Sequence, residues 1–465
     1  MKRTAVLNVV GLTGSLVGPG TPRIAAFARA GAQAAVQPNL PAVTCTAQST
    51  YLTGLQPAEH GVVANGWYDR TLAEVQFWKQ SNHVVQGRKL WEELRELSPG
   101  FTCAKLFWWY NMYSTADWSI TPRPMYPADG RKFFDIYSWP YAIREQIKTE
   151  LGEFPFATFW GPAAGTQSPQ GGRDAATRWI AESARWMERK FQPSLSLVYL
   201  PHLDYNLQRL GPAHPGIARD LTEIDQIVGD LIDFFLERGV QPVLVSEYGI
   251  TAVDTPVHLN RLFRECGWLT IKEELGLELL DAGASRVFAV ADHQVAHIYL
   301  RDAALEKEVR SNLEHEPGVE AVYDRKQLAA LGLNHSRAGD LVAVARENAW
   351  FTYYYWFDDT KAPDFARCVD IHRKPGYDPV ELFLDPRIPA VKLKIMWRLL
   401  QKKLGFRMLM DVIPLDATLV RGSHGRLPSK PVDGPVFISS RAELIATPCI
   451  QATDVYHLLK RHVLY

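Results

Sequence analysis

Short apolar runs alternate with longer amphipathic stretches along the chain, and this alternation predicts an α/β fold. Runs rich in Val and Leu occupy residues 5–10, 195–200 and 240–245, and each ends in polar or glycine-rich residues. Such runs are typical of strands that are buried on both faces of a parallel sheet. Between the last two runs, apolar residues recur every three or four positions from Ile217 to Phe235, which predicts a helix. Strand, helix and strand in this order indicate a crossover between parallel strands.

The predicted sheet also indicates where ligands would bind. In open α/β sheets, ligands lie outside the carboxyl ends of the strands. The polar residues that follow Val10, Leu200 and Val245 are therefore the first candidates for chemistry.

The pattern changes between residues 284 and 350. This stretch has the order strand, helix, strand, strand, which could form a small sheet with helices on one side. We predict an inserted α+β cap at 284–350. Residues 1–283 and 351–465 would form the core, a mostly parallel central sheet with helices on both faces. A length of 465 residues agrees with one large domain and a smaller inserted one.

A basic amphipathic helix is predicted from Val391 to Leu404. Its apolar residues recur at helical spacing, at Leu393, Met396, Trp397, Leu400 and Leu404. We expect these side chains to pack inward while the lysines face solvent, although the basic face could also meet a lipid or a phosphate.

Composition and charge exclude several classes of function. Lys and Arg number 51, and so do Asp and Glu, so no net field favours a nucleic acid polymer or a membrane surface. Five cysteines without CxxC spacing suit a reducing compartment. The first residues fit a signal peptide or a first buried strand, and we take them as a strand. No stretch approaches the roughly 20 apolar residues of a transmembrane helix. We predict a cytoplasmic protein, and the sequence leaves its oligomeric state open.

The segment from residue 41 to 70 carries the most specific motif. Its notable residues are Pro41, Thr44, Thr53, Gly54, Pro57, His60, Gly61, Val62 and Asn65. Thr44 would by itself also suit a helix N-cap. The segment resembles the nucleophile region of the type I phosphodiesterase/nucleotide pyrophosphatase branch of the alkaline phosphatase superfamily. The resemblance implies that Thr44 is the nucleophile, and that the backbone N–H of Cys45 and the side-chain amide of Asn65 hold a phosphoryl oxygen. A helix N-terminus suits such a group, because its N–H groups are unpaired. His60 is expected to shape the turn.

The resemblance also implies a divalent metal site, in which some ligand positions are altered. The ligands that it carries over are Asp204, Glu247 and His424, with Glu247 in place of an Asp. The positions that depart from the family are Val10, Gln208 and Tyr248, where it has Asp, His and His. Further candidate ligands are Asn8, Gln208, His202 and His372. Loss of two imidazoles disfavours the usual dizinc site, whereas an oxygen-rich site for Mg²⁺ or Mn²⁺ remains chemically sensible. The choice among Zn²⁺, Mn²⁺ and Mg²⁺ stays open.

An aromatic stretch from residue 107 to 132 contains the candidate substrate-binding residues Arg123 and Lys132. It could line a pocket for an aromatic or nucleotide-like group, or it could cover the edge of the sheet. His293 and His297 are expected to be structural, although site roles stay open for them.

These observations predict a metal-dependent phosphoester hydrolase that acts on a small phosphorylated substrate through a phosphothreonine intermediate. One alternative is a degenerate family member that binds a phosphorylated metabolite or a partner protein without hydrolysis. Another is transfer of the phosphoryl group to an acceptor other than water.

Overall fold

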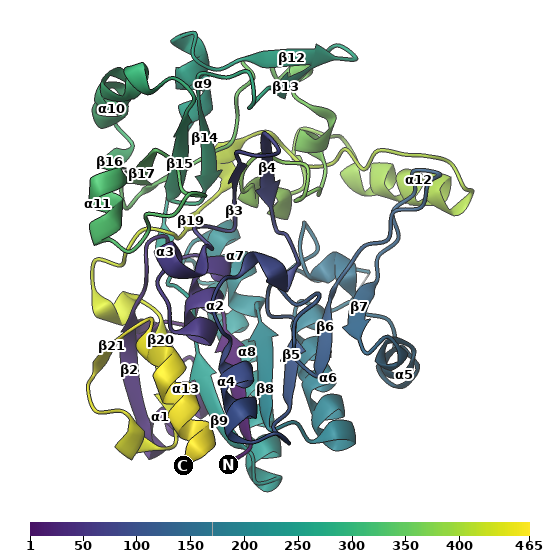
Figure 1. Cartoon of the computed structure of the whole chain (residues 1–465). Helices are drawn as coiled ribbons and strands as arrows, with labels where there is room; N and C mark the ends of the chain where they lie inside the picture. Colours follow the sequence, from purple (N-terminus) through teal and green to yellow (C-terminus); the bar gives the residue numbers. More distant parts are fainter. Residues whose placement is uncertain (170) are drawn as a thin grey trace.

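A nine-stranded sheet forms the centre of the computed structural model, which describes residues 1–169 and 171–465 (Figure 1). The strand order is β21 (Cys449–Gln451), β2 (Ala32–Gln37), β20 (Val436–Ser439), β9 (Gln241–Val245), β1 (Thr4–Val9), β8 (Leu195–Leu200), β5 (Cys103–Leu106), β6 (Trp118–Pro122) and β7 (Ile136–Trp139). β1 pairs in parallel with β8 and β9, and only β20 and β7 run antiparallel to their neighbours in this sheet. The predicted mostly parallel sheet is confirmed.

Helices cover both faces of this sheet, as predicted. On one face, α1 (Pro22–Ala30) and α6 (Ala175–Phe191) pack against α8 (Ile217–Glu237), which is the helix that the apolar spacing predicted. On the other face, α2 (Thr44–Thr53) and α4 (Leu90–Leu97) pack against α13 (Asp454–Leu464) (Figure 1). Two short helices follow site segments: α3 (Pro57–His60) comes after α2, and α7 (His202–Leu210) comes after β8.

A second, four-stranded antiparallel sheet lies beyond the carboxyl ends of the central strands (Figure 1). Its order is β14 (Val287–Asp292), β15 (Val295–Leu300), β17 (Leu341–Ala345) and β16 (Val319–Asp324). Helices α10 (Glu306–His315) and α11 (Arg325–Ala330) pack on β16. All four strands fall within the predicted insert, and their hydrophobic core also takes in residues outside it, including Phe77, Val253 and Val420.

The predicted basic helix forms as α12 (Val391–Lys403), but the predicted direction of its apolar face is wrong. The side chains expected to pack inward are 45–64% exposed: Leu393, Met396, Trp397, Leu400 and Leu404. Val391 and Ile395 pack against the core instead. Lys394 and Arg398 hold the helix through ion pairs to Asp411. The side of the helix that contacts the body thus combines two apolar residues with two ion pairs.

Two further sequence predictions concern membranes and cysteines. In the part of the chain that the structure describes, no helix combines the length and the apolar character needed to cross a bilayer. All five cysteines are free thiols.

Two buried histidines, His60 and His462, make the fold sensitive to acid. Burial lowers the pKa of His60 from 6.5 to about 3 and that of His462 from 6.5 to about 4. His60 Nε2 hydrogen bonds to Thr50, and His60 Nδ1 accepts a bond from the Val62 N–H, which confirms its structural role. Because the unfolded chain takes up these protons first as the pH falls, stability is present above pH 6.5 and is lost below it. At roughly 1.4 kcal/mol per pH unit for each histidine, the two together are expected to remove on the order of 5 kcal/mol between pH 6.5 and 4.5.

Urea unfolding at the two pH values measures this loss. His60→Gln is expected to reduce the pH dependence, while His83→Gln, at an exposed position, leaves it unchanged. The same pH dependence in His60→Gln as in the wild type would contradict the prediction.

Candidate active site

Thr44 opens helix α2 above the carboxyl ends of the parallel strands. Val43 has an extended backbone and α2 begins at Thr44, so the hydroxyl lies in a first turn whose N–H groups have no intrahelical partner. A hydrogen bond from the Ala42 N–H to the Gly425 carbonyl fixes the preceding loop. Thr44 is buried, and its Oγ1 lies 3.3 Å from the hydroxyl of Tyr248. The predicted nucleophile therefore contacts a side chain of the site.

The two groups expected to hold a phosphoryl oxygen contact each other. The Cys45 N–H donates to Asn65 Oδ1 at 3.0 Å, and Asn65 Nδ2 donates to Asp292 Oδ1 at 3.1 Å. Asp292 also accepts from the Asn65 backbone N–H and from His293 Nδ1. Neither Cys45 nor Asn65 lines the cavity described below. We expected the Cys45 N–H to hold a phosphoryl oxygen. It donates to the Asn65 amide oxygen instead.

A chain of hydrogen bonds connects Thr44 to helix α7. The Tyr248 hydroxyl donates to Asp204 Oδ1 at 3.0 Å, and Gln208 Nε2 donates to Asp204 Oδ2 at 2.8 Å. Asp204 and Gln208 are one helical turn apart, so their side chains meet on one face. The Tyr377 hydroxyl then donates to Gln208 Oε1 at 2.8 Å. Burial raises the pKa of Asp204 to about 7, although the bonds from Tyr248 and Gln208 oppose this shift.

Glu247 lies just beyond β9, between β1 and α2. Its Oε1 accepts from Asn8 Nδ2 at 2.5 Å and from Gln48 Nε2 at 2.6 Å. Two buried oxygens, Glu247 Oε2 and Asn8 Oδ1, have no hydrogen-bond partner among the described residues. Burial raises the pKa of Glu247 to about 8, and the bonds from Gln48 and Asn8 oppose this rise. Val10, where the resemblance implies an Asp, is a buried core residue whose side chain has no atom that could bind a metal ion.

His424 lies against Tyr248 and does not join the two carboxylates. Its Nδ1 donates to the Ala42 carbonyl at 2.9 Å, and its ring stacks on Tyr248 at 3.5 Å and lies 3.7 Å from His293. In the described part of the chain, the ligand atoms of Asp204, Glu247 and His424 do not all lie within 4.8 Å of one another. The predicted trio of ligands is therefore not gathered at one point, because the Tyr248 side chain contacts both Asp204 and His424.

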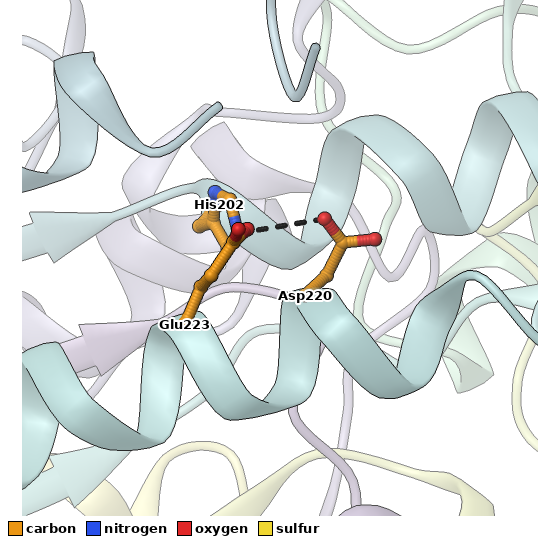
Figure 2. Close-up of side chains that lie close together, drawn as sticks. All are labelled: His202, Asp220 and Glu223. Atoms are coloured by element: carbon orange, nitrogen blue, oxygen red, sulfur yellow. Dashed lines mark hydrogen bonds and ion pairs between the residues drawn. The ribbon is translucent and has the colours of Figure 1, made fainter. Parts of the chain in front are cut away.

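His202 belongs to a separate cluster with Asp220 and Glu223. Figure 2 shows the three side chains pointing toward one another from α7 and α8. His202 Nε2 lies 3.0 Å from Glu223 Oε2 and 3.5 Å from Asp220 Oδ1, and the three residues are close enough to hold a metal ion. However, Arg173 already pairs with both carboxylates and Arg219 pairs with Glu223. The positive charge that these acids require is present without an ion.

A cavity of about 120 Å³ lies next to Thr44 and is lined mainly by aromatic side chains. They are Trp78, Trp109, Tyr126, Phe134, Phe156, Phe159, Trp160, Tyr199, Tyr205, Tyr248 and Tyr377. Of the polar candidates, Lys132, His372 and Asp204 also line it. The side chain of Arg123 is exposed and does not line it. The aromatic stretch around Trp109 thus forms one wall of a pocket, which was one of the two interpretations left open.

The comparison with known families agrees with this geometry. The model of the type I phosphodiesterase/nucleotide pyrophosphatase family matches residues 4–378. The chain belongs to this family. The family is named for enzymes that hydrolyse phosphodiester and pyrophosphate bonds.

Individual relatives of the family are distant. An uncharacterised pyrophosphatase/phosphodiesterase of Schizosaccharomyces pombe is 22% identical over 233 residues, which is 48% of this chain and 39% of that protein. The chain thus spans about two fifths of this relative's length. Murine ectonucleotide pyrophosphatase/phosphodiesterase 5 matches with a TM-score of 0.58 at 15% identity, over 100% of this chain and 95% of the other.

An inactive variant of the murine protein has been solved in complex with AMP. Phosphonoacetate hydrolase from Sinorhizobium meliloti, in complex with phosphonoformate, matches with a TM-score of 0.61 at 14% identity, over 100% of this chain and 96% of the other. At these identities, the likeness shows the shared fold.

Family members generally depend on divalent metal ions, and the residues of this chain fit only part of such a site. On the side of Asp204, both carboxylate oxygens accept hydrogen bonds, and an amide and a phenol replace two imidazoles. On the other side, Glu247 and Asn8 are joined by one hydrogen bond, and each has a second buried oxygen that accepts none. No positively charged side chain contributes to the pKa shift of Glu247. Buried carboxylates require a positive partner or a proton. The donor set therefore fits a single hard cation at Glu247 and Asn8, and it does not fit the two-ion site.

Proposed function

We propose that the protein hydrolyses a small organic phosphoester and that Thr44 is its nucleophile. The observation that carries this proposal is the position of the Thr44 hydroxyl, which lies in the first turn of α2, lines the aromatic cavity and contacts Tyr248. A helix N-terminus favours the negative charge of a phosphoryl group. The side chains beside the hydroxyl offer a path for its proton.

In the first step, Thr44 Oγ1 bonds to phosphorus as the bond from phosphorus to the leaving oxygen breaks. The Thr44 proton passes to the Tyr248 oxygen while the Tyr248 proton moves to Asp204 Oδ1. A carboxylate with a pKa of about 7 suits this role near neutral pH. In the second step, water attacks the phosphothreonine, and Thr44 leaves and recovers its proton by the same path. The proton that the attacking water loses passes to solvent, and it balances the proton that the leaving-group oxygen takes from solvent after the first step.

Glu247 and Asn8 are the residues proposed to hold a divalent cation. Their unpaired oxygens are hard donors, which favour Mg²⁺ or Mn²⁺ over Zn²⁺. When bound, such an ion supplies positive charge that stabilises the transferring phosphoryl group. Gln48 and Asn8 keep the Glu247 carboxylate in position through hydrogen bonds to its other oxygen.

The cavity supports a substrate with an aromatic or nucleotide-like group. Trp78 and Trp109 lie 4.8 Å apart between ring centroids in its wall, and Lys132 adds a positive charge. Such a lining binds flat apolar groups. The AMP and the phosphonoformate in the structures of two similar proteins are both small phosphorus compounds. The free thiols support the cytoplasmic location that we expect.

Assays with aryl phosphodiesters and aryl phosphomonoesters test the proposal. After treatment with a chelator, activity is expected to return with Mg²⁺ or Mn²⁺ at least ~10-fold above the level with Zn²⁺. Binding of a phosphate ligand without turnover in any of the three ions would overturn the proposal, and would favour a protein that only binds its ligand.

A further inference from the structure

Helix α12 carries an apolar face that no other segment of residues 1–169 and 171–465 covers. The helix projects from the body of the molecule (Figure 1), and no residue of it is buried. The exposed side chains are Leu393, Met396, Trp397, Leu399, Leu400 and Leu404. The apolar surface continues in the following segment with Phe406 and Leu409. This is a continuous apolar surface of the kind that marks an interaction site.

The opposite side of α12 fixes its orientation. Val391 and Ile395 pack against the second hydrophobic core. Lys394 Nζ donates to Asp411 at 2.8 Å, and Arg398 donates to the same carboxylate at 3.1 Å. At 100° per residue, these four positions lie on the far side of the helix from Leu393, Leu400 and Leu404. Anchoring therefore holds the apolar face outward.

The charge of the segment from residue 391 to 410 has one sign. It contains six Lys and Arg residues and no Asp or Glu. Ion pairs to Asp411 occupy Lys394 and Arg398. The remaining cations on the helix flank nearest the apolar face are Lys392 and Lys403, and Arg407 follows in the next segment. An anionic and apolar partner would complement this surface.

The anchored side of α12 adjoins the mouth of the aromatic cavity. Lys402 Nζ lies 5.4 Å from the ring centroid of Phe134, and Arg407 Nε donates to the Asp129 carbonyl at 2.7 Å. Phe134 and Tyr126 line the cavity and are themselves exposed. Helix α12 therefore lies beside the exposed aromatic side chains at the entrance of the pocket.

We propose that the segment from residue 391 to 410 binds the surface of an anionic lipid bilayer. The apolar face of α12 enters the interfacial layer, and the flanking lysines contact lipid phosphates. Trp397 lies within this face, and tryptophan is enriched at the membrane–water interface. A bilayer supplies both an apolar layer and negative charge over an area large enough to cover α12 and the exposed aromatic side chains of the pocket mouth. This inference does not depend on the hydrolytic function.

Flotation with lipid vesicles tests the inference on the full chain. The protein is expected to float with vesicles that contain phosphatidylglycerol, and at least ~10-fold less with vesicles of phosphatidylcholine alone. High salt is expected to weaken the binding. The double variant W397E/L400E is expected to lose about tenfold or more of it, because both charges would enter the apolar layer. The matched control L72E/L275E changes two exposed leucines elsewhere and is expected to bind like the wild type.

Activity toward a soluble aryl phosphodiester is expected to be equal in the wild type and in both variants, which separates this test from that of the proposed function. Failure of the wild type to float with anionic vesicles would overturn the inference, and so would undiminished binding of W397E/L400E. Self-association that W397E/L400E abolishes, in the absence of vesicle binding, would identify a second copy of the chain as the occupant.

Discussion

Replacement of Thr44 by alanine is expected to lower kcat by roughly 10³-fold or more, because it removes the atom that forms the bond to phosphorus. The change should leave the fold intact. Thr44 is small, its Oγ1 hydrogen bonds to Tyr248, and helix α2 is otherwise held by its packing against α13. Steady-state kinetics with an aryl phosphodiester, together with thermal unfolding, would measure both effects.

Two further variants separate nucleophilic attack from a packing effect. Thr44→Ser keeps a hydroxyl and is expected to retain most of the activity. Tyr248→Phe keeps the ring that stacks on His424 but removes the contact with Asp204, and should reduce kcat by about 10²-fold. Trapping of a phosphorylated chain in the wild type but not in Thr44→Ala would support the covalent step. Normal turnover by Thr44→Ala would rule out the proposed nucleophile.

Glu247→Gln is expected to abolish the response to divalent ions and to reduce activity about 10²-fold or more. The amide has nearly the same shape, and its oxygen can still accept from Asn8 and Gln48. The substitution also removes a buried carboxylate. Without added ions, the variant should therefore unfold at the same temperature as the wild type or above it. The wild type, in contrast, should gain thermal stability when Mg²⁺ or Mn²⁺ is added.

The matched control for this prediction is Glu223→Gln, in the cluster with His202 and Asp220. If the ion binds at Glu247, then Glu223→Gln keeps the stabilisation by the ion and Glu247→Gln loses it. The reverse pattern would place the ion at the His202 cluster and would contradict our interpretation of the two unpaired oxygens.

Local patterns in the sequence predicted the parts of the site that depend on local structure. The apolar runs that became β1, β8 and β9 correctly indicated the edge of the sheet where Asp204 and Glu247 lie. The motif around Thr44 located the start of α2. These features could be predicted because strand burial and helix initiation are encoded within a few residues.

Contacts between distant segments could not be predicted in this way. Tyr377 reaches Gln208 across 169 positions of the chain, and Asp292 reaches Asn65 across 227. Asp292 follows a buried apolar run and precedes His293, a signal that could have drawn attention to it, but nothing local indicates its partner. The same limit explains α12, since periodicity shows which residues share a face but not what covers that face.

His202 shows how the structure that follows a strand decides which side chains meet. A spacing of two residues from Asp204 would place both side chains on one face of a strand. The strand ends at Leu200, however, and α7 begins at His202. Two positions along a helix point in nearly opposite directions, so His202 contacts Glu223 while Asp204 faces Tyr248.

The place of β20 in the central sheet has a consequence for synthesis of the chain on the ribosome. β20 fits between β2 and β9, although β2 is made near the beginning of translation and β20 near its end. At about 5–20 residues per second, β2 waits roughly 20–80 s for its neighbour. During that time both edges of β2 and one edge of β9 are open, because β21, the other neighbour of β2, is made later still, and open edges are templates for mispairing. We therefore expect a chaperone to shield these open edges during translation, until β20 and β21 have emerged from the ribosome.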